Sequence, residues 1–373
     1  MPSLALTLTL TLTAALHAPL GTPVAPTPVP ETVANPPTTP AKSAPKHATT
    51  AGSPNDLVVR RVPAQGSPEE LTVFTSADTS SVARIKDGRI KDGRIEDGRI
   101  ALAFQGFPAD DPSAFNRAAV RFSDDDGRTW TEAARIVVDN LDASLAPPFD
   151  PTLVALPDGR VRLYFISFVA RGLKPGTSPT ATAVYSAIST DGVRFAFEPG
   201  VRFAVEGRVV LDAAAALHQG VFHIVVPDNG TADEFLERRA KGEAQPGGNG
   251  YHAVSTDGLA FDRAADLSLP STRNRWWGNL LSDGDSLLFF GTGPGLWPLV
   301  SKDGMSWSVA TKPVALTGVD PAVLRIHDEA LLVVTTHETP QMPRSDSPSA
   351  APAGVAPAAE SAPKSGARTP PSR

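Results

Sequence analysis

Three aspartates stand directly before hydrophobic runs of the sequence, at places where a β-strand would begin. Asp150 is followed by Pro-Thr-Leu-Val, Asp212 by a run of alanines and Asp320 by Pro-Ala-Val-Leu. Carboxylates that meet in one depression repel each other, and this repulsion raises the pKa of at least one of them. A protonated carboxyl group beside an ionised one is the arrangement that glycoside hydrolysis uses. We therefore take Asp150, Asp212 and Asp320 as candidate catalytic residues; in the alternative, each only bonds nearby backbone amides.

Other side chains are candidates for binding a substrate rather than for reacting with it. Aromatic rings stack on sugar faces, and polar side chains bond sugar hydroxyls. The candidates of these two kinds are Trp276, Trp277, Asn279, Arg61 and His337. Because neighbouring residues of a strand point to opposite faces, one of the two adjacent tryptophans is expected to pack into the core.

The elements that position these residues are indicated by a turn motif that occurs four times. Residues 123–130 read Ser-Asp-Asp-Asp-Gly-Arg-Thr-Trp, and shorter versions begin at Ser189, Ser255 and Ser301. In such a turn, Asp accepts hydrogen bonds from backbone amides, Gly takes the positive φ and Ser caps a second amide. Each copy lies between two hydrophobic runs, as a hairpin turn does. A strand–turn–strand unit repeated every few tens of residues is typical of a β-propeller.

The first copy of this turn matches the Asp-box, S-x-D-x-G-x-T-W, and the other three are similar to its shorter variant, S-x-D-G-x-x-W/F. The chain therefore resembles the sialidase-like β-propellers. The resemblance implies an all-β fold in which the Asp-boxes lie at the outer rim, away from the sugar site. It indicates the architecture and does not identify catalytic residues.

Strand patterns predict five blades of four antiparallel strands. The last unit begins at Val319 and has only two strands before the Pro-rich end, whereas two unassigned strands occur at 56–62 and 71–76. Closing the ring with these N-terminal strands would leave no exposed edge. Repeats of Arg-Ile-Lys/Glu-Asp-Gly, starting at Arg89 and Arg94, are interpreted as a duplication that lengthens one hairpin, and residues 231–250 as a long polar loop.

The strand-initial aspartates resemble those of the five-bladed glycosidases of the arabinanase and β-xylosidase type, in which three carboxylates begin inner strands. Phe149-Asp150-Pro151, followed by Pro157-Asp158-Gly159, is most similar to the second blade of that type. The resemblance implies that Asp150 modulates a pKa and that Asp212 is the acid, although the family carries Glu there. The family's base begins the first-blade strand, where this chain has Ser80 and Ser81, with Asp78 slightly upstream. Asp320 is then the substitute base.

The likeness to sialidases themselves is weaker. Arg61-Val62-Pro63 is similar to their early Arg-Ile-Pro motif, which implies a role for Arg61 at the site. That family uses a tyrosine nucleophile, and the three tyrosines of this chain, Tyr164, Tyr185 and Tyr251, all lie before the last blade. Sialidase activity is therefore not expected.

Composition limits the compartment and the partners. The chain has 373 residues, no cysteine and a formal charge of −6, which argue against thiol chemistry, thiolate metal sites and nucleic-acid binding. Residues 1–18 are interpreted as a signal peptide, 19–55 as a disordered linker, 56–339 as the propeller and 340–373 as a disordered tail. We expect a secreted, periplasmic or cell-surface monomer with no membrane span after removal of the signal.

These observations support two classes of function. One is an exported glycoside hydrolase-like propeller that acts on or binds carbohydrate in its central pit. The other is a non-catalytic propeller that binds glycan or protein, which the missing first-blade aspartate favours. No cofactor is expected, although His337 and Glu338 follow the last predicted strand and would hold water or a structural cation if they reach the channel; a place at the rim is the alternative.

Overall fold

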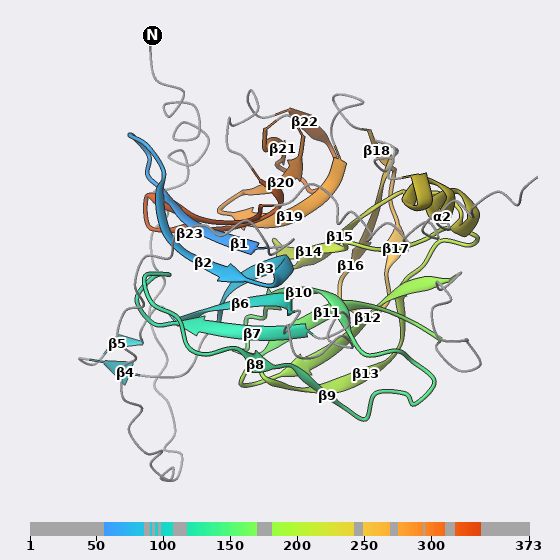
Figure 1. The fold of residues 1–373 in the computed structure, drawn as a ribbon, viewed down its shortest axis with the longest axis horizontal. Helices are drawn as coiled ribbons and strands as arrows, with labels where there is room; N and C mark the ends of the chain where they lie inside the picture. Colours follow the sequence, from blue (N-terminus) through green and yellow to red (C-terminus); the bar gives the residue numbers. More distant parts are fainter. Residues whose placement is uncertain are drawn as a thin grey trace, which may run out of the picture. The chain divides into compact units, whose positions relative to one another are not determined.

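The fold is a five-bladed β-propeller, seen in a computed structural model (Figure 1). The structure describes residues 56–85, 90–91, 94–95, 98–106, 118–169, 181–241, 249–268, 275–293, 295–309 and 318–336. The predicted fold class is confirmed. The predicted domain limits at residues 18, 55 and 339 lie outside the described residues. The candidate residue His337 lies outside them too.

The first two blades are four-stranded sheets with additions. From the centre outwards, blade 1 contains β3 (Ala77–Ile85), β6 (Arg99–Gly106), β7 (Ala118–Ser123) and β8 (Ala134–Arg135). The repeated pentads form the short hairpin of β4 (Ile90–Lys91) and β5 (Arg94–Ile95), as predicted. Blade 2 contains β10 (Phe149–Ala155), β11 (Val161–Phe168), β12 (Thr182–Ser189) and β13 (Arg194–Phe203), with β9 (Val137–Asp139) added in parallel.

The next two blades follow the same plan. Blade 3 contains β14 (Ala214–His218), β15 (Val221–Pro227), β16 (Asn249–Ser255) and two short outer strands, β17 (Asp262–Arg263) and β18 (Leu267–Ser268), which both pair with β16. Blade 4 contains β19 (Arg275–Asp283), β20 (Ser286–Thr292), β21 (Trp297–Ser301) and β22 (Trp307–Val309).

The fifth blade closes the ring with both ends of the described chain. Its sheet order is β23 (Val319–Ile326), β24 (Glu329–Thr335), β1 (Asp56–Val62) and β2 (Glu69–Thr75). β1 pairs with β24 along its length, and the amide of Thr336 donates to the carbonyl of Asp56 at 2.9 Å. The predicted closure by N-terminal strands is therefore confirmed, and it removes the exposed edge of β24.

A helix replaces part of the polar loop predicted at 231–250. α2 (Ala232–Lys241) follows β15 and begins with a capping box. Glu234 donates its amide to the hydroxyl of Thr231 at 3.3 Å, and the amide of Thr231 donates to the Glu234 carboxylate at 2.8 Å. These two bonds satisfy amide groups that a helix start otherwise leaves unpaired.

Hydrophobic residues fill the space between neighbouring blades, so the core consists of five seams rather than one central cluster. Side chains that alternate along each strand point to the seams on its two sides. The inner strands β3, β10, β14, β19 and β23 contact one another in this order around the centre. Hydrogen bonds reinforce these contacts: Leu153 donates its amide to Ser81 at 2.9 Å, and Val323 donates to Asn279 at 3.3 Å.

The repeated turns have the predicted chemistry: Asp accepts backbone amides in all four, and Ser accepts the glycine amide in the first three. In the second, Ser189 accepts from the amide of Gly192 at 2.9 Å, and the Asp191 carboxylate accepts from Val193 and Arg194 at 2.8 and 2.9 Å. Gly192 has a φ of 77°. A Cβ at this glycine would lie 3.3 Å from the ring of Phe122 in the preceding blade. Each turn glycine approaches the preceding blade in this way, so the turns help to lock the blades together.

Candidate functional site

The inner strands of four blades begin with a backbone distortion beside the centre of the ring. Asp150, Asp212 and Asp320 have φ values of 46°, 52° and 49°, and Thr79 in the first blade has 37°. Residues other than glycine rarely adopt this left-handed backbone conformation, because their Cβ atom then crowds the backbone. Strain that recurs at equivalent places is commonly associated with functional sites. Register shifts in β3, β10 and β23 mark the same distortion.

Four carboxyl groups meet at these strand starts: Asp78, Asp150, Asp212 and Asp320. The amide of Asp212 donates to Oδ2 of Asp150 at 3.2 Å, which links blades 2 and 3. Thr335 of blade 5 donates its hydroxyl to Oδ1 of Asp78 in blade 1 at 3.1 Å. The charges of these carboxylates act on one another across the ring. The three predicted catalytic aspartates therefore lie together, and a fourth joins them.

Asp78 changes the description of the first blade. The sequence interpretation placed Ser80 and Ser81 at the start of its inner strand, with no acid there; β3 instead begins at Ala77, so Asp78 belongs to the strand. Thr79 takes the left-handed position that aspartate takes in the other three blades, and Asp78 precedes it by one residue. Ser81 is a seam residue that accepts from Leu153. Residues 77–80, Ala-Asp-Thr-Ser, show no hydrophobic alternation that would predict a strand start. The only indication in the sequence was an Asp followed by a small polar residue.

Burial and mutual repulsion keep protons on the ring of acids. Burial, and then the charge of Asp78, raises the pKa of Asp150 to about 7, although the Asp212 amide opposes this shift. Burial raises the pKa of Asp212 well above its ordinary value, and the charges of Asp150, Asp320 and Asp78 add to the effect. Burial and the charges of Asp78 and Asp150 also raise the pKa of Asp320, and a hydrogen bond from Thr79 opposes this rise. The pKa values of these three buried carboxyl groups are therefore all raised above that of an ordinary aspartate.

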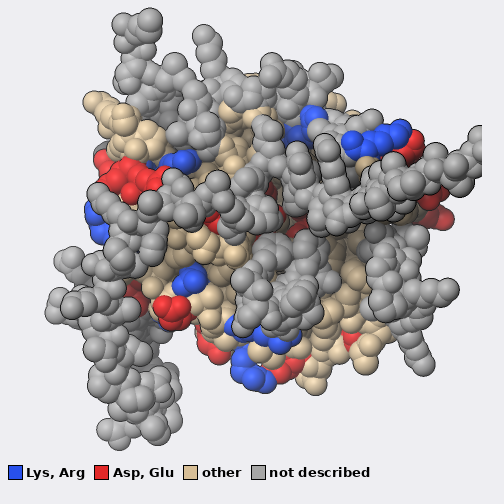
Figure 2. Space-filling view, in the orientation of Figure 1, with Lys and Arg blue, Asp and Glu red and all other residues tan. Residues whose placement is uncertain are grey.

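The four carboxyl groups differ in access to solvent. Asp150 and Asp320 are 8% and 9% exposed, whereas Asp78 and Asp212 are half-buried. A group that transfers a proton to or from a substrate must reach it directly. Over the whole residue, Asp78 and Asp212 are therefore the better placed for direct contact with a substrate, although burial raises the pKa of Asp212 as it raises those of Asp150 and Asp320. In Figure 2, a few atoms of Asp or Glu residues are visible near the middle of this face.

Blade 4 contributes aromatic and amide side chains instead of an acid. Trp276 is 1% exposed and packs between Phe289 and Trp297, with ring centroids 5.1 and 5.2 Å away. Trp277 is half-buried, so it is the tryptophan that a ligand could reach. Asn279 is buried and accepts the amide of Val323 from blade 5.

Arg61 has structural contacts at the seam between blades 5 and 1. Its guanidinium donates to the backbone carbonyl of Asp126 in the first repeated turn and lies 3.2 Å from the carboxylate of Glu329. It is 7% exposed. An equivalent contact occurs at the seam of blades 2 and 3, where Arg162 donates to the carbonyl of Asp257 in the third turn at 2.8 Å. The sequence gives no means of separating this structural role from substrate binding.

Within the described part of the chain, no cluster of three or more His, Cys, Asp or Glu side chains has the geometry to hold a metal ion. No helix among the described residues is both long and apolar enough to cross a bilayer.

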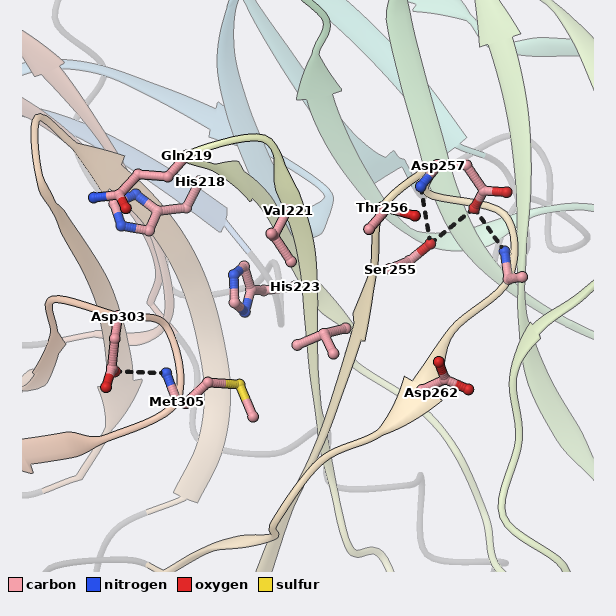
Figure 3. A pocket seen from close by; sticks show the side chains of 12 residues that line it. His218, Gln219, Val221, His223, Ser255, Thr256, Asp257, Asp262, Asp303 and Met305 are labelled. Atoms are coloured by element: carbon pink, nitrogen blue, oxygen red, sulfur yellow. Dashed lines mark hydrogen bonds between the residues drawn. The ribbon is translucent and has the colours of Figure 1, made fainter.

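A cavity of about 530 Å³ lies away from the acids, between β15, β16 and the fourth turn (Figure 3). Three buried histidines occur at this seam. Nδ1 of His223 lies 3.1 Å from Nε2 of His252, and Nδ1 of His218 lies 3.0 Å from the hydroxyl of Ser282. The ring of His223 packs against Gly304 of the fourth turn, and His252 meets the edge of Trp307. The pair of His223 and His252 therefore supports the docking of blade 4 on blade 3.

Acid is expected to weaken this histidine seam. Burial and the neighbouring histidines lower the pKa of His223 to about 4, and burial lowers that of His252 to about 4. An unfolded histidine titrates near 6.5, so between these values the unfolded chain binds more protons. The contribution of this histidine pair to the free energy of unfolding should then fall as pH drops from about 6.5 towards 4, by on the order of 2 kcal/mol after allowance for solvent screening. Urea unfolding of the wild type and of His223→Gln across this range measures the effect.

The comparison with the variant isolates the histidines from the acids. Asp150 has a raised pKa, so its contribution to stability falls as pH rises towards 7, in the opposite sense. Both proteins carry Asp150, so the difference between their pH slopes reports on the histidine pair. Equal slopes for the wild type and His223→Gln would contradict the prediction.

Comparisons with known proteins identify no family for this chain. No protein family model matches the chain, and no curated protein sequence is similar to it. Solved structures of similar fold include a thermostable family-43 glycoside hydrolase, which is 11% identical, with 72% of this chain and 91% of that chain covered and a TM-score of 0.46. The α-L-arabinofuranosidase from Lactobacillus brevis is 13% identical, with 69% and 82% covered and a TM-score of 0.43. Inulosucrase from Halalkalicoccus jeotgali, bound to kestose, is 14% identical, with 69% and 75% covered and a TM-score of 0.49.

Proposed function

We propose that the protein is a glycoside hydrolase that works through the four carboxyl groups at the centre of its ring. The observation that carries this proposal is the pairing of two half-buried acids, Asp78 and Asp212, with two buried ones, Asp150 and Asp320. Glycoside hydrolysis needs one protonated and one ionised carboxyl group near the scissile bond. The case for a non-catalytic module came from a missing first-blade acid, and Asp78 supplies one.

Each acid has a distinct role in this proposal. Asp212, with its raised pKa, protonates the glycosidic oxygen as the bond to the anomeric carbon breaks. Asp78 removes a proton from the water that attacks this carbon, in place of Asp320, which is more buried. Asp150 accepts the amide of Asp212 and its negative charge helps to raise the pKa of that acid. The reaction inverts the anomeric configuration if the carboxyl groups leave room for the water.

The substrate in this proposal is a neutral sugar. The charges that act on Asp150, Asp212 and Asp320 all come from other carboxylates of the ring. A sialic or uronic acid would add another negative charge to this site and meet repulsion. Trp277 is the candidate stacking platform for the sugar ring. Export of the enzyme, based on the apolar residues 1–18, is part of the same proposal.

A panel of aryl glycosides, including arabinofuranoside, xyloside and sialoside, tests the proposal. We expect release from a neutral glycoside and none from the sialoside. Asp212→Asn should lower kcat/KM by roughly 10²–10⁴-fold for aryl groups that leave poorly. The loss should be smaller for activated leaving groups, because these depart without protonation. If the folded wild-type protein releases no aryl group from any glycoside of the panel, hydrolysis is contradicted and a binding module is favoured.

A further inference from the structure

The seam that closes the ring also contains two reciprocal contacts to the central acids. Thr335, at the end of β24 in blade 5, donates its hydroxyl to Oδ1 of Asp78 at 3.1 Å. In return, Thr79 of blade 1 bonds the carboxyl group of Asp320 in blade 5. The amide of Thr79 also donates to Oδ1 of Asp78 at 2.8 Å. Blade 5 therefore bonds Asp78 of blade 1, and blade 1 bonds Asp320 of blade 5.

The position of Thr335 is fixed on several sides. Its Cα pairs with Leu57 of β1 and with Val319 of β23. Leu331 and Val333, which share its face of β24, pack in the seam against blade 1. Thr335 is 1% exposed, so a substrate would not touch it. The β-branched side chain restricts χ1 of Thr335, and its hydroxyl is directed at Asp78.

The corresponding threonine of blade 4 bonds backbone groups instead. Thr292, at the end of β20, accepts from the amide of Asp320 at 2.7 Å and donates to the carbonyl of Trp277 at 2.9 Å. Both threonines thus connect the second strand of one blade to the strand start of the next. Thr335 differs because its partner is a carboxylate that the proposed reaction uses.

Asp78 needs such a donor because carboxylates face it from three other blades. Asp150 of β10, Asp212 before β14 and Asp320 of β23 all interact with its charge. Repulsion from these groups favours orientations that turn the Asp78 side chain away from the site. A hydroxyl hydrogen bond to an ionised carboxylate opposes this and stabilises the ionised form.

We propose that Thr335 is a positioning residue, whose hydroxyl orients the Asp78 carboxylate across the closing seam so that the site is complete only when the last strand has closed the ring. This inference rests on the proposed function for the role of Asp78 as base. The contact itself does not depend on that role, so it can be tested separately.

The first test follows Asp78 without any substrate. In protein with ¹³C-labelled aspartate carboxyls, the Asp78 resonance is assigned with Asp78→Asn and titrated in the wild type, Thr335→Val and Thr335→Ser. Thr335→Val keeps the shape of the side chain and removes the donor, so the midpoint of Asp78 should move to higher pH. Thr335→Ser keeps the hydroxyl and should titrate as the wild type does. If Thr335→Val does not fold, a comparison of Thr335→Ala with Thr335→Ser again contrasts the absence of the hydroxyl donor with its presence.

The second test uses the glycoside that responds in the panel. Thr335→Val should lower kcat/KM by about 10-fold, with its acid limb moved to higher pH and with KM little changed. Ser255→Ala, which removes a buried hydroxyl bond to Asp257 at the rim, controls for a general loss of stability. An unchanged Asp78 titration in folded Thr335→Val would overturn the inference. A wild-type protein without activity on any glycoside would contradict the proposed function alone, because the titration of Asp78 would still test its contact with Thr335.

Discussion

Replacing Asp78 with asparagine is expected to lower kcat/KM by roughly 10²–10⁴-fold, which is the usual contribution of a general base. Asparagine keeps the size of the side chain and an oxygen for the bonds from Thr79 and Thr335. It cannot accept a proton from water. The variant should therefore fold and bind substrate while its chemical step is slow. Its acid limb in the pH profile of kcat/KM should disappear, because that limb reports protonation of the base.

Two matched variants decide which acid is the base. Ser80→Ala alters the same strand two residues later, at a buried hydroxyl without a hydrogen-bond partner among the described residues, and should keep activity within about threefold of the wild type. Asp320→Asn should reduce activity less than Asp78→Asn, since Asp320 is more buried. The reverse order, with Asp320→Asn inactive and Asp78→Asn active, would return the role of base to Asp320.

Gly278→Ala should be the most damaging small substitution in blade 4. A Cβ at Gly278 would lie 1.8 Å from the carbonyl oxygen of Phe290 and 2.8 Å from its carbon. These are backbone atoms of the paired strand β20, and they cannot rotate away. β19 and β20 would have to separate beside Trp277. We expect a loss of at least about 4 kcal/mol in the free energy of unfolding, measured with urea, or a failure to fold.

Gly106→Ala is the control for this substitution. Gly106 ends β6, the second strand of blade 1, and an added Cβ would meet only the ring of Phe104 at 3.5 Å, an ordinary contact. This variant should stay within about 1 kcal/mol of the wild type. Equal stabilities of Gly278→Ala and Gly106→Ala would show that the close approach at Gly278 is not a constraint on the fold.

The fold could be predicted because it depends on local patterns. Each turn carries its own Ser, Asp and Gly, and each inner strand is a short hydrophobic run, so neither needs information from distant residues. The ring closure followed from two missing and two spare strands. The helix α2 was missed because most of its residues are polar, although Ala232, Phe235, Leu236 and Ala240 have helical spacing. The Thr231 and Glu234 pair of its capping box was the available indication.

The site was predicted only in part, because its geometry depends on long-range contacts. Asp150, Asp212 and Asp320 precede recognisable hydrophobic runs, and their meeting follows from the propeller geometry. Asp78 lies within β3, whose first residues are mostly polar, and the extra residue of the bulge shifts it by one position relative to the other three aspartates. The placement of Trp276 in the core and Trp277 near the surface could not be decided from the sequence, because the register shift in β19 alters the alternation.

The closing seam also determines how the propeller would respond to a mechanical load. The two ends of the described chain leave the same end of an antiparallel pair, with Asp56 bonded to Thr336 and Leu57 paired with Thr335. Tension on both ends would therefore peel β1 from β24 one hydrogen bond at a time, instead of shearing many bonds together. Thr335 is among the first residues on this path. Pulling on the ends would thus release Asp78 from its hydroxyl donor before most of the propeller unfolds.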